Sequence, residues 1–254
     1  MKGCFIVFEG IDGSGKSTQF DGLGKKLKKD DYNVVLTREP THNRPIGQLI
    51  RKILYNHTSV SEEALALLFA ADRTDHTIKK IKPALQRNEI VLSDRYVYSS
   101  FAYQGKGMDI ELNVDWLKII NRYAIHPDLV IFLDIPPQVG LERIQKVQQR
   151  VQDDKYFEDL IKQQKIRSVY YNLFKVDRTT PDLWEYHKDN KERGKGKGNL
   201  IKLNGTQVLV VEGTLPKEEI INDIYEVVKM LLKEKKINTN TKDEFMFKKL
   251  VQFS

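Results

Sequence analysis

The chain has very little cysteine and lacks any long apolar run. Cys4 is the single cysteine among 254 residues, which excludes an internal disulfide and a cysteine-ligated zinc site. Only five apolar residues, Cys4 to Phe8, precede Glu9, far fewer than a signal peptide or a membrane span requires. We therefore expect a cytoplasmic protein with no membrane association, in which Cys4 is a buried strand residue.

Acidic residues are too few to balance the basic ones, but the excess is local. The formal net charge is +7, of which residues 188–202 carry +4 and residues 233–254 carry +3. The rest of the chain is neutral in aggregate, so we expect two solvated basic appendages and no nucleic-acid partner. An anionic partner surface is the alternative interpretation of these two segments.

A complete phosphate-binding pattern, GxxxxGK[ST], follows the first apolar run. Its glycines allow backbone N–H groups to approach a polyphosphate at the positive end of the next helix, the lysine adds a mobile charge, and the first hydroxyl can bind Mg²⁺. The pattern predicts a nucleoside triphosphate site. It consists of Gly10, Ile11, Asp12, Gly13, Ser14, Gly15, Lys16, Ser17 and Thr18.

Five short apolar runs alternate with helix-like stretches. This alternation is typical of a doubly wound α/β fold, and we expect a five-stranded parallel sheet flanked by helices. Ligands in such folds gather at the carboxyl ends of the strands. The predicted strands are Phe5–Phe8, Val34–Thr37, Ile90–Ser93, Leu129–Asp134 and Val208–Val211.

The helices are predicted from their boundary signals. Ser61 with two acidic residues behind it is a helix start, and the following pattern is expected to stop near Pro83. The charged stretch 139–176 is too long for one buried helix, so we expect a break at 152–154. The glycine-lysine stretch 193–198 cannot bury enough apolar surface to order itself.

Asp94, Arg95 and Tyr96 follow the third predicted strand. Such a triplet is most often a surface salt bridge. Next to a phosphate loop, however, an aspartate can hold Mg²⁺ or its water, and an arginine can clamp a phosphate with two hydrogen bonds.

These segments together resemble the thymidylate kinases. The resemblance covers residues 1–177 and implies the P-loop nucleoside monophosphate kinase fold, a homodimer, and Mg²⁺-dependent transfer of a phosphoryl group from ATP to dTMP. It rests on Phe8–Thr18, on Thr37–Pro40, on Phe69–Arg73, on Asp94–Tyr96 and on Ala102–Gly105.

The resemblance also implies roles for single residues. Lys16, Asp94, Arg95 and Arg143 are the expected catalytic residues together with Arg150, and Ser17 and Asp94 the expected metal ligands, the latter directly or through water. Gly213 and Thr214 are placed at the adenine. The dTMP site is expected to comprise Asp12, Glu39, Pro40, Arg51, Phe69, Arg73, Arg95, Ser100, Tyr103 and Gln104.

The phosphate loop has no arginine between Gly10 and Lys16, unlike that of some family members. Related enzymes supply this charge from a mobile lid, here expected at about 140–158. Arg143, Lys146 and Arg150 share one helical face, and we interpret Arg150 as the lid arginine. A solvated basic face is the alternative. We expect a kinase domain over residues 1–235 with a basic insertion at 178–202, followed by a tail at 236–254.

Two other functions are left open. One is a different deoxynucleotide or nucleoside monophosphate kinase on the same scaffold, which a radical change at the base pocket would favour. The other is a non-catalytic nucleotide sensor or nucleic-acid-binding protein, in which Lys16, Asp94 or Arg95 would be lost. All three residues are present.

Overall fold

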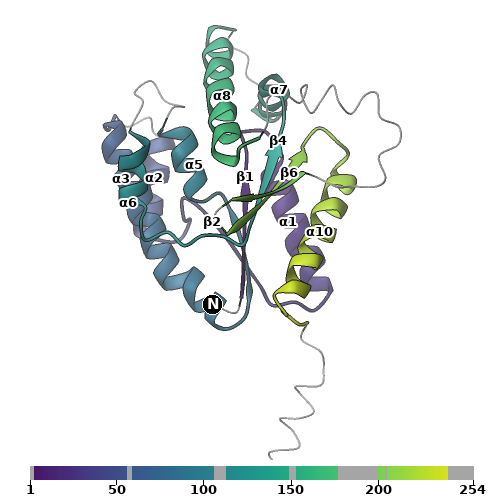
Figure 1. Ribbon diagram of the computed structural model, residues 1–254. Coiled ribbons are helices and arrows are strands. Elements are labelled where there is room, and N and C mark those ends of the chain that lie inside the picture. Colours follow the sequence, from purple (N-terminus) through teal and green to yellow (C-terminus); the bar gives the residue numbers. More distant parts are fainter. Residues whose placement is uncertain are drawn as a thin grey trace, which may run out of the picture.

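The computed structural model describes residues 3–55, 59–105, 113–148, 153–176, 199–203 and 205–239. Helices pack on both faces of a central sheet, as the alternation of runs predicts (Figure 1). The elements are β1 (Cys4–Glu9), α1 (Lys16–Lys29), β2 (Val34–Arg38), α2 (Pro45–Tyr55), α3 (Glu62–His76), the π-helical turn η1 (Thr77–Ile81), α4 (Lys82–Gln86), β3 (Ile90–Asp94), α5 (Val97–Tyr103), α6 (Val114–Ile120), β4 (Leu129–Asp134), α7 (Pro137–Gln148), α8 (Asp153–Phe174), β5 (Asn199–Leu203), β6 (Thr206–Glu212) and α10 (Lys217–Glu234).

Within the described residues, the sheet has six strands in the order β2-β3-β1-β4-β6-β5. The five predicted strands are present and mutually parallel, but the predicted strand count is wrong because β5 is added antiparallel to β6. The two strands meet in a tight turn, with Leu203 paired to Thr206 and Gly205 at a φ of +87°. β5 lies at the end of the segment interpreted as a basic insertion, where the lysines obscure its short apolar pattern; the rest of that segment, 178–198, is outside the described residues.

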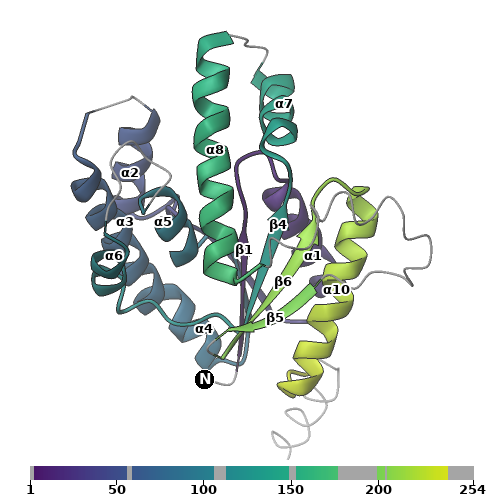
Figure 2. The same cartoon turned by 45° about the horizontal axis from the view of Figure 1, so that its top comes forward.

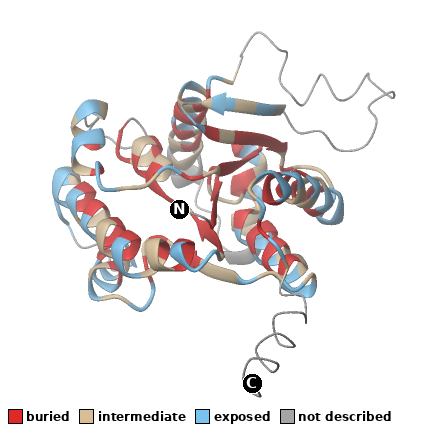
Figure 3. Cartoon of the chain, turned by 60° about the horizontal axis from the view of Figure 1, so that its bottom comes forward, coloured by how far each residue is buried: buried red, intermediate tan, exposed pale blue. Residues whose placement is uncertain are grey.

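Two apolar layers hold the sheet between helices. Alternate residues of β1, β3, β4 and β6 pack against α1 and α10 on one face. The alternate residues, on the opposite face, form two clusters: one packs against α8 and α5, and the other packs against η1 and α4. The central strands β1, β3, β4 and β6 are therefore mostly buried while the outer helix faces are exposed (Figure 3), and Cys4 is buried in β1 as predicted. None of the helices in the described ranges has the length and apolar character needed to cross a membrane.

The helix after Ser61 begins as predicted but does not stop near Pro83. The Ser61 side chain accepts a hydrogen bond from the Ala64 N–H, and α3 runs to His76. The chain then continues through η1 into α4, where Pro83 occupies the first turn. Proline is tolerated there because the first-turn N–H groups have no helical acceptor.

The stretch 139–176 forms two helices, as predicted, but the predicted position of the break at 152–154 is partly wrong, because Asp153 and Asp154 already belong to α8. α7 ends at Gln148 and α8 begins at Asp153, and the two helices stand side by side at one end of the sheet (Figure 2). Arg150, the predicted lid arginine, falls between these helices in the sequence and is outside the described residues. The stretch 193–198 and the tail from residue 240 onward are also outside the described residues.

Candidate active site

The phosphate loop joins the carboxyl end of β1 to the first turn of α1. Gly10, Gly13 and Gly15 all have positive φ angles, which residues with a Cβ rarely adopt. At Gly13 a Cβ would also lie 2.2 Å from the carbonyl oxygen of Gly140 in α7. The glycines thus give the loop its backbone conformation and allow α7 to pack directly against it.

Lys16 is buried beneath this loop. Its Nζ donates to the carbonyl oxygens of Gly10 at 2.8 Å and Ile11 at 2.6 Å, and lies 3.3 Å from Ser14 Oγ. Burial, together with the nearby positive charge of Arg95, lowers the pKa of Lys16 to about 7. The structure therefore holds a titratable amine where the sequence predicts the phosphate-binding charge.

Ser17, in the first turn of α1, meets Asp94, the last residue of β3. Ser17 Oγ donates to Asp94 Oδ2 over 2.8 Å. In the described ranges, no group of three or more His, Cys, Asp or Glu side chains could hold a metal ion. The pair nevertheless fits Mg²⁺, which takes one or two protein oxygens and completes its shell with water and substrate phosphates.

Arg95 is held by several partners at the start of α5. Its Nη2 pairs with Asp12 Oδ1 and donates to Tyr103 Oη at 3.1 Å, while its Nη1 donates to Ser99 Oγ at 3.1 Å. Its guanidinium also lies 4.8 Å from the centre of the Tyr103 ring. Burial would raise the pKa of Asp12, but the charges of Arg95 and Lys16 outweigh it and lower this pKa below its usual range. The pair is therefore ionised at neutral pH.

Glu9, the last residue of β1, fixes the start of α5. Its Oε1 accepts from the backbone N–H groups of Tyr96 at 3.0 Å and Ser99 at 3.2 Å. Its Oε2 accepts from Ser99 Oγ at 2.6 Å and Tyr170 Oη at 2.8 Å. Burial raises the pKa of this carboxyl above its usual value. The apolar run and the loop mark the position of Glu9 in the sequence, but not its partners.

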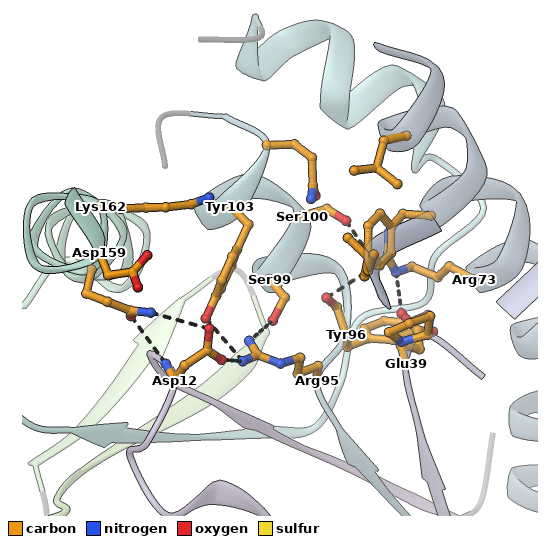
Figure 4. Close-up of a pocket in the computed structure, with 16 residues that line it drawn as sticks. Asp12, Glu39, Arg73, Arg95, Tyr96, Ser99, Ser100, Tyr103, Asp159 and Lys162 are labelled. Carbon is orange, nitrogen blue, oxygen red and sulfur yellow. Dashed lines mark hydrogen bonds and ion pairs between the residues drawn. The ribbon is translucent and has the colours of Figure 1, made fainter. Parts of the chain in front are cut away.

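A cavity of about 370 Å³ opens beside Arg95. Figure 4 shows Asp12 and Arg95 at one end and Arg73 with Glu39 at the other. The lining includes nine of the ten residues predicted for the dTMP site: Asp12, Glu39, Pro40, Phe69, Arg73, Arg95, Ser100, Tyr103 and Gln104. Arg51 is not in the lining; its Nη2 donates to the carbonyl oxygen of Pro40, and its Nε is buried with no hydrogen-bond partner among the described residues.

Phe69 and Arg73 lie on one face of α3, as their spacing predicts. Phe69 is half-buried and packs against the apolar cluster of Ile50, Ile53 and Leu65 while lining the cavity. Arg73 is almost completely buried, with 2% of its surface exposed. Its Nε donates to Glu39 Oε2 at 2.8 Å.

A second cavity, of about 670 Å³, lies over the phosphate loop and the start of α1. It shares Asp12 and Arg95 with the first cavity, so the two meet at this ion pair. Arg143 lines it, donating from Nη1 to the carbonyl oxygen of Gly13 at 3.3 Å and from Nη2 to that of Gly213 at 3.0 Å. Gly213 also lines the cavity, whereas Thr214 does not; the Thr214 hydroxyl donates to Glu212 Oε1 at 2.7 Å.

Sequence reasoning missed the contribution of α8. Asp159, Lys162 and Gln163 line the first cavity from this helix (Figure 4). Gln163 contacts Asp12 at two points: its Oε1 accepts from the Asp12 N–H, and its Nε2 donates to Asp12 Oδ2, both over 3.3 Å. Polar residues at i, i+3 and i+4 are a usable signal, but the many charged residues along this stretch conceal it.

The comparisons with known proteins agree with this geometry. The family model described as thymidylate kinase matches residues 8–181. The probable thymidylate kinase of Thermococcus kodakarensis is 45% identical over 178 residues, 66% of this chain and 83% of the relative. The thymidylate kinase of Halothermothrix orenii is 42% identical over 217 residues, 80% of this chain and all of the relative, and that of Staphylococcus haemolyticus is 35% identical over 233 residues, 91% and 99%. Two cavities joined at Asp12 and Arg95 and a match of this extent lead to one conclusion: the chain belongs to the thymidylate kinase family and is a phosphotransferase.

Proposed function

We propose that this protein transfers the γ-phosphoryl group of ATP to dTMP, giving dTDP and ADP. The observation that carries the proposal is the pair of cavities that meet at Asp12 and Arg95. One contains the phosphate loop and suits the donor, and the other contains Phe69 and Arg73 and suits the acceptor. A phosphate bound at the junction would be within reach of both nucleotides.

The chemistry requires charge stabilisation more than proton transfer. A phosphate monoester has a second pKa of about 6, so its attacking oxygen is already largely deprotonated at neutral pH and needs no general base. The barrier lies in bringing two anions into line and stabilising the charge in the transition state. Lys16, Arg95 and Arg143, which line the cavity over the loop, can supply this stabilisation.

On the donor side, the backbone N–H groups from Gly10 to Thr18 would bind the ATP phosphates, and Gly213 and Thr214 would lie at the adenine. Ser17 and Asp94 would hold Mg²⁺, which neutralises phosphate charge when bound. Arg143 is already fixed between the phosphate loop and Gly213 by its two carbonyl contacts, so it can contact the donor without ordering a long side chain.

On the acceptor side, Arg95 would bind the dTMP phosphate and Tyr103 would lie beneath the sugar. Phe69 would stack on the thymine, with Arg73 donating to a base carbonyl and Ser100 and Gln104 completing the pocket. Glu39 and Pro40 shape the wall, and Arg51, held against the Pro40 carbonyl, would reach the phosphate from behind that wall.

The lid arginine remains a part of this proposal. If Arg150 acts mainly on the transition state, Arg150→Ala should lower kcat by about two orders of magnitude or more while nucleotide affinities change little. Lys146→Ala is the matched control, because Lys146 is a basic residue near the end of α7, four positions before Arg150 in the sequence. Unchanged turnover in Arg150→Ala would reassign the role to another residue.

We also infer a cytoplasmic homodimer. The support for the dimer is three exposed apolar side chains, one on α3 and one on each of two elements that contact α3, namely η1 and α6: Leu67, Ile78 and Ile119. Light scattering of the protein eluted from a size-exclusion column at micromolar concentration should give twice the mass of one chain. The substitution Leu67→Glu should lower the measured mass towards that of the monomer.

A coupled ADP-release assay across nucleoside and deoxynucleoside monophosphates tests the main proposal. We expect the highest kcat/KM with dTMP, and no turnover when Mg²⁺ is chelated. A preference for another monophosphate would favour the alternative of a different kinase on the same scaffold.

A further inference from the structure

A buried chain of polar side chains lies behind the end of the acceptor cavity that Arg73 lines. Its centre is His76, the last residue of α3, which is fully buried. His76 Nδ1 lies 3.0 Å from Glu39 Oε1, and His76 Nε2 lies 2.6 Å from Thr37 Oγ1. The other oxygen of Glu39 accepts from Arg73 Nε. The chain therefore runs from Thr37 through His76 and Glu39 to the cavity wall.

The partners of His76 decide where its proton is. A carboxylate can only accept, so Nδ1 facing Glu39 must carry a hydrogen. Nε2 can then either accept from the Thr37 hydroxyl or, in the doubly protonated ring, donate to it. In both states His76 donates to Glu39, and the carboxylate is fixed from the side opposite Arg73.

Arg73 depends on that carboxylate for both its charge and its orientation. Its guanidinium donates from Nη1 to Asn121 Oδ1 and from Nη2 to Ser100 Oγ at 3.1 Å and the Tyr96 carbonyl oxygen at 3.4 Å, all of which are neutral acceptors. Its two ion-pair atoms are therefore Nε and Glu39 Oε2. Because Arg73 is almost completely buried, a shift of Glu39 would leave the charge poorly compensated and turn the guanidinium plane.

We propose that His76 is a positioning residue for acceptor-base selectivity, acting through Glu39 to hold Arg73 where it donates to a carbonyl oxygen of the base. The inference rests on the proposed function, because it takes Arg73 as the base contact. A guanidinium has donors and no acceptors, so it favours a carbonyl substituent over an amino group at the same position. That preference depends on alignment, which a buried second residue can maintain.

The alternative is that His76 only stabilises the core. Two substitutions separate the possibilities, because the amide nitrogen of asparagine falls near the position of Nδ1, whereas that of glutamine falls near Nε2. His76→Asn should keep the donor to Glu39 and His76→Gln should lose it. Thr206→Val is a control for stability alone. Thr206 is the first residue of β6, and this substitution removes the buried hydrogen bond from its hydroxyl to the Pro127 carbonyl oxygen.

The assay compares kcat/KM for dTMP with that for 5-methyl-dCMP, which carries an amino group in place of the 4-carbonyl and an acceptor nitrogen in place of N3–H. We expect the wild type to prefer dTMP by about a hundredfold or more. His76→Gln should lower this preference at least about tenfold, through a higher KM for dTMP and an unchanged KM for ATP. His76→Asn and Thr206→Val should stay within about threefold of the wild-type preference.

A double-mutant cycle adds a readout that loss of stability would not move. Glu39→Gln weakens the pair with Arg73 and should lower the preference by itself, and the double variant with His76→Gln should lose little more than either single variant. Glu39→Gln also gives the test if His76→Gln fails to fold, since a wild-type preference in Glu39→Gln would overturn the inference.

The outcomes distinguish the inference from the proposed function. A wild-type preference retained in His76→Gln would overturn the role of His76 alone, even if its melting temperature falls. A wild-type protein that does not prefer dTMP over 5-methyl-dCMP would overturn the assignment of Arg73 to the base and this inference with it.

Discussion

Glu9 offers a quantitative test of how the phosphate loop is joined to the arginine behind it. The substitution Glu9→Ala removes two buried oxygens and deprives four donors of their acceptor: two backbone N–H groups, of Tyr96 and Ser99, and two hydroxyls, of Ser99 and Tyr170. The hydroxyls are 3.1 Å apart and can pair with each other. Of the two N–H groups at the start of α5, that of Ser99 also donates to the Tyr96 carbonyl oxygen at 3.1 Å, so the Tyr96 N–H is the donor most affected by the loss of Glu9.

The size of the effect follows from this count. Each buried donor without an acceptor costs about 1–3 kcal/mol, and removing one member of a buried charged group costs about 3–5 kcal/mol. Burial raises the pKa of Glu9, so removing this carboxyl also removes the cost of burying its charge. This gain offsets part of the loss, and we expect Glu9→Ala to lower the free energy of unfolding by about 3 kcal/mol. For a chain of this size that corresponds to a melting temperature lower by roughly 6–12 °C.

Glu9→Gln is the matched variant. Its amide oxygen can still accept from both N–H groups and its amide nitrogen can donate to the hydroxyls, so we expect a loss of about 1 kcal/mol or less near neutral pH. Urea denaturation of the three proteins measures these differences. If Glu9→Ala unfolds within about 1 kcal/mol of the wild type, or if both variants are equally unstable, the role given to the Glu9 oxygens is wrong.

The pH dependence of the same pair has a defined sign. Because the pKa of Glu9 is raised from its usual 4.5 by burial, the folded protein binds this proton more tightly than the unfolded chain. The wild type should therefore lose stability relative to Glu9→Gln as pH rises from about 4.5 through the folded-state pKa. A constant difference, or one that changes in the opposite direction, would contradict a raised pKa.

Three further predictions concern the loop and its surroundings. With a pKa of about 7, roughly nine tenths of the Lys16 amines are neutral at pH 8, so ATP binding at that pH should take up close to one proton. Calorimetry in two buffers of different ionisation enthalpy would detect this proton uptake, and the variant Lys16→Arg should show none. Gly13→Ala should abolish ATP binding because its Cβ would lie 2.2 Å from the Gly140 carbonyl, whereas Gly22→Ala, which meets only an Ile221 side chain at 3.3 Å, should bind ATP normally. Gln163→Leu should raise the KM for dTMP several-fold and leave that for ATP unchanged, since it removes both contacts to Asp12; equal changes in the two constants would argue against a role limited to the acceptor site.

The sequence predicts the fold where one rule dominates. Strands buried on both faces are continuous apolar runs, so β1, β3 and β4 are found with nearly correct bounds. β5 was missed because it is an edge strand with a lysine inside it, and its pairing depends on a turn to β6 at Gly205. Such pairing is a tertiary preference, which a local pattern does not contain.

The candidate site was predictable to the extent that its residues follow strand ends or share a helix face. Asp94 and Arg95 follow β3, and Phe69 and Arg73 are four residues apart on α3. What the pattern lacks is pairing across distant segments. Gln163 reaches Asp12 over a sequence separation of 151 residues, and no periodicity along α8 identifies its partner.

Pairing also explains why so many carboxylates surround a site meant for anions. Arg73 and Arg95, which line the acceptor cavity, are mostly buried, and each is paired with a carboxylate: Glu39 and Asp12, respectively. Burying an unpaired guanidinium would cost free energy, so each carboxylate stabilises the charge of its arginine where water is scarce. The carboxylate also sets the plane in which the guanidinium donates its hydrogen bonds. The basic groups that are not neutralised by such a pair are then Lys16 and Arg143, whose hydrogen-bond acceptors within the described residues are carbonyl and hydroxyl oxygens instead of carboxylates. Neutralising a carboxylate in this site should therefore impair catalysis by misaligning its arginine, even though it makes the site more positive.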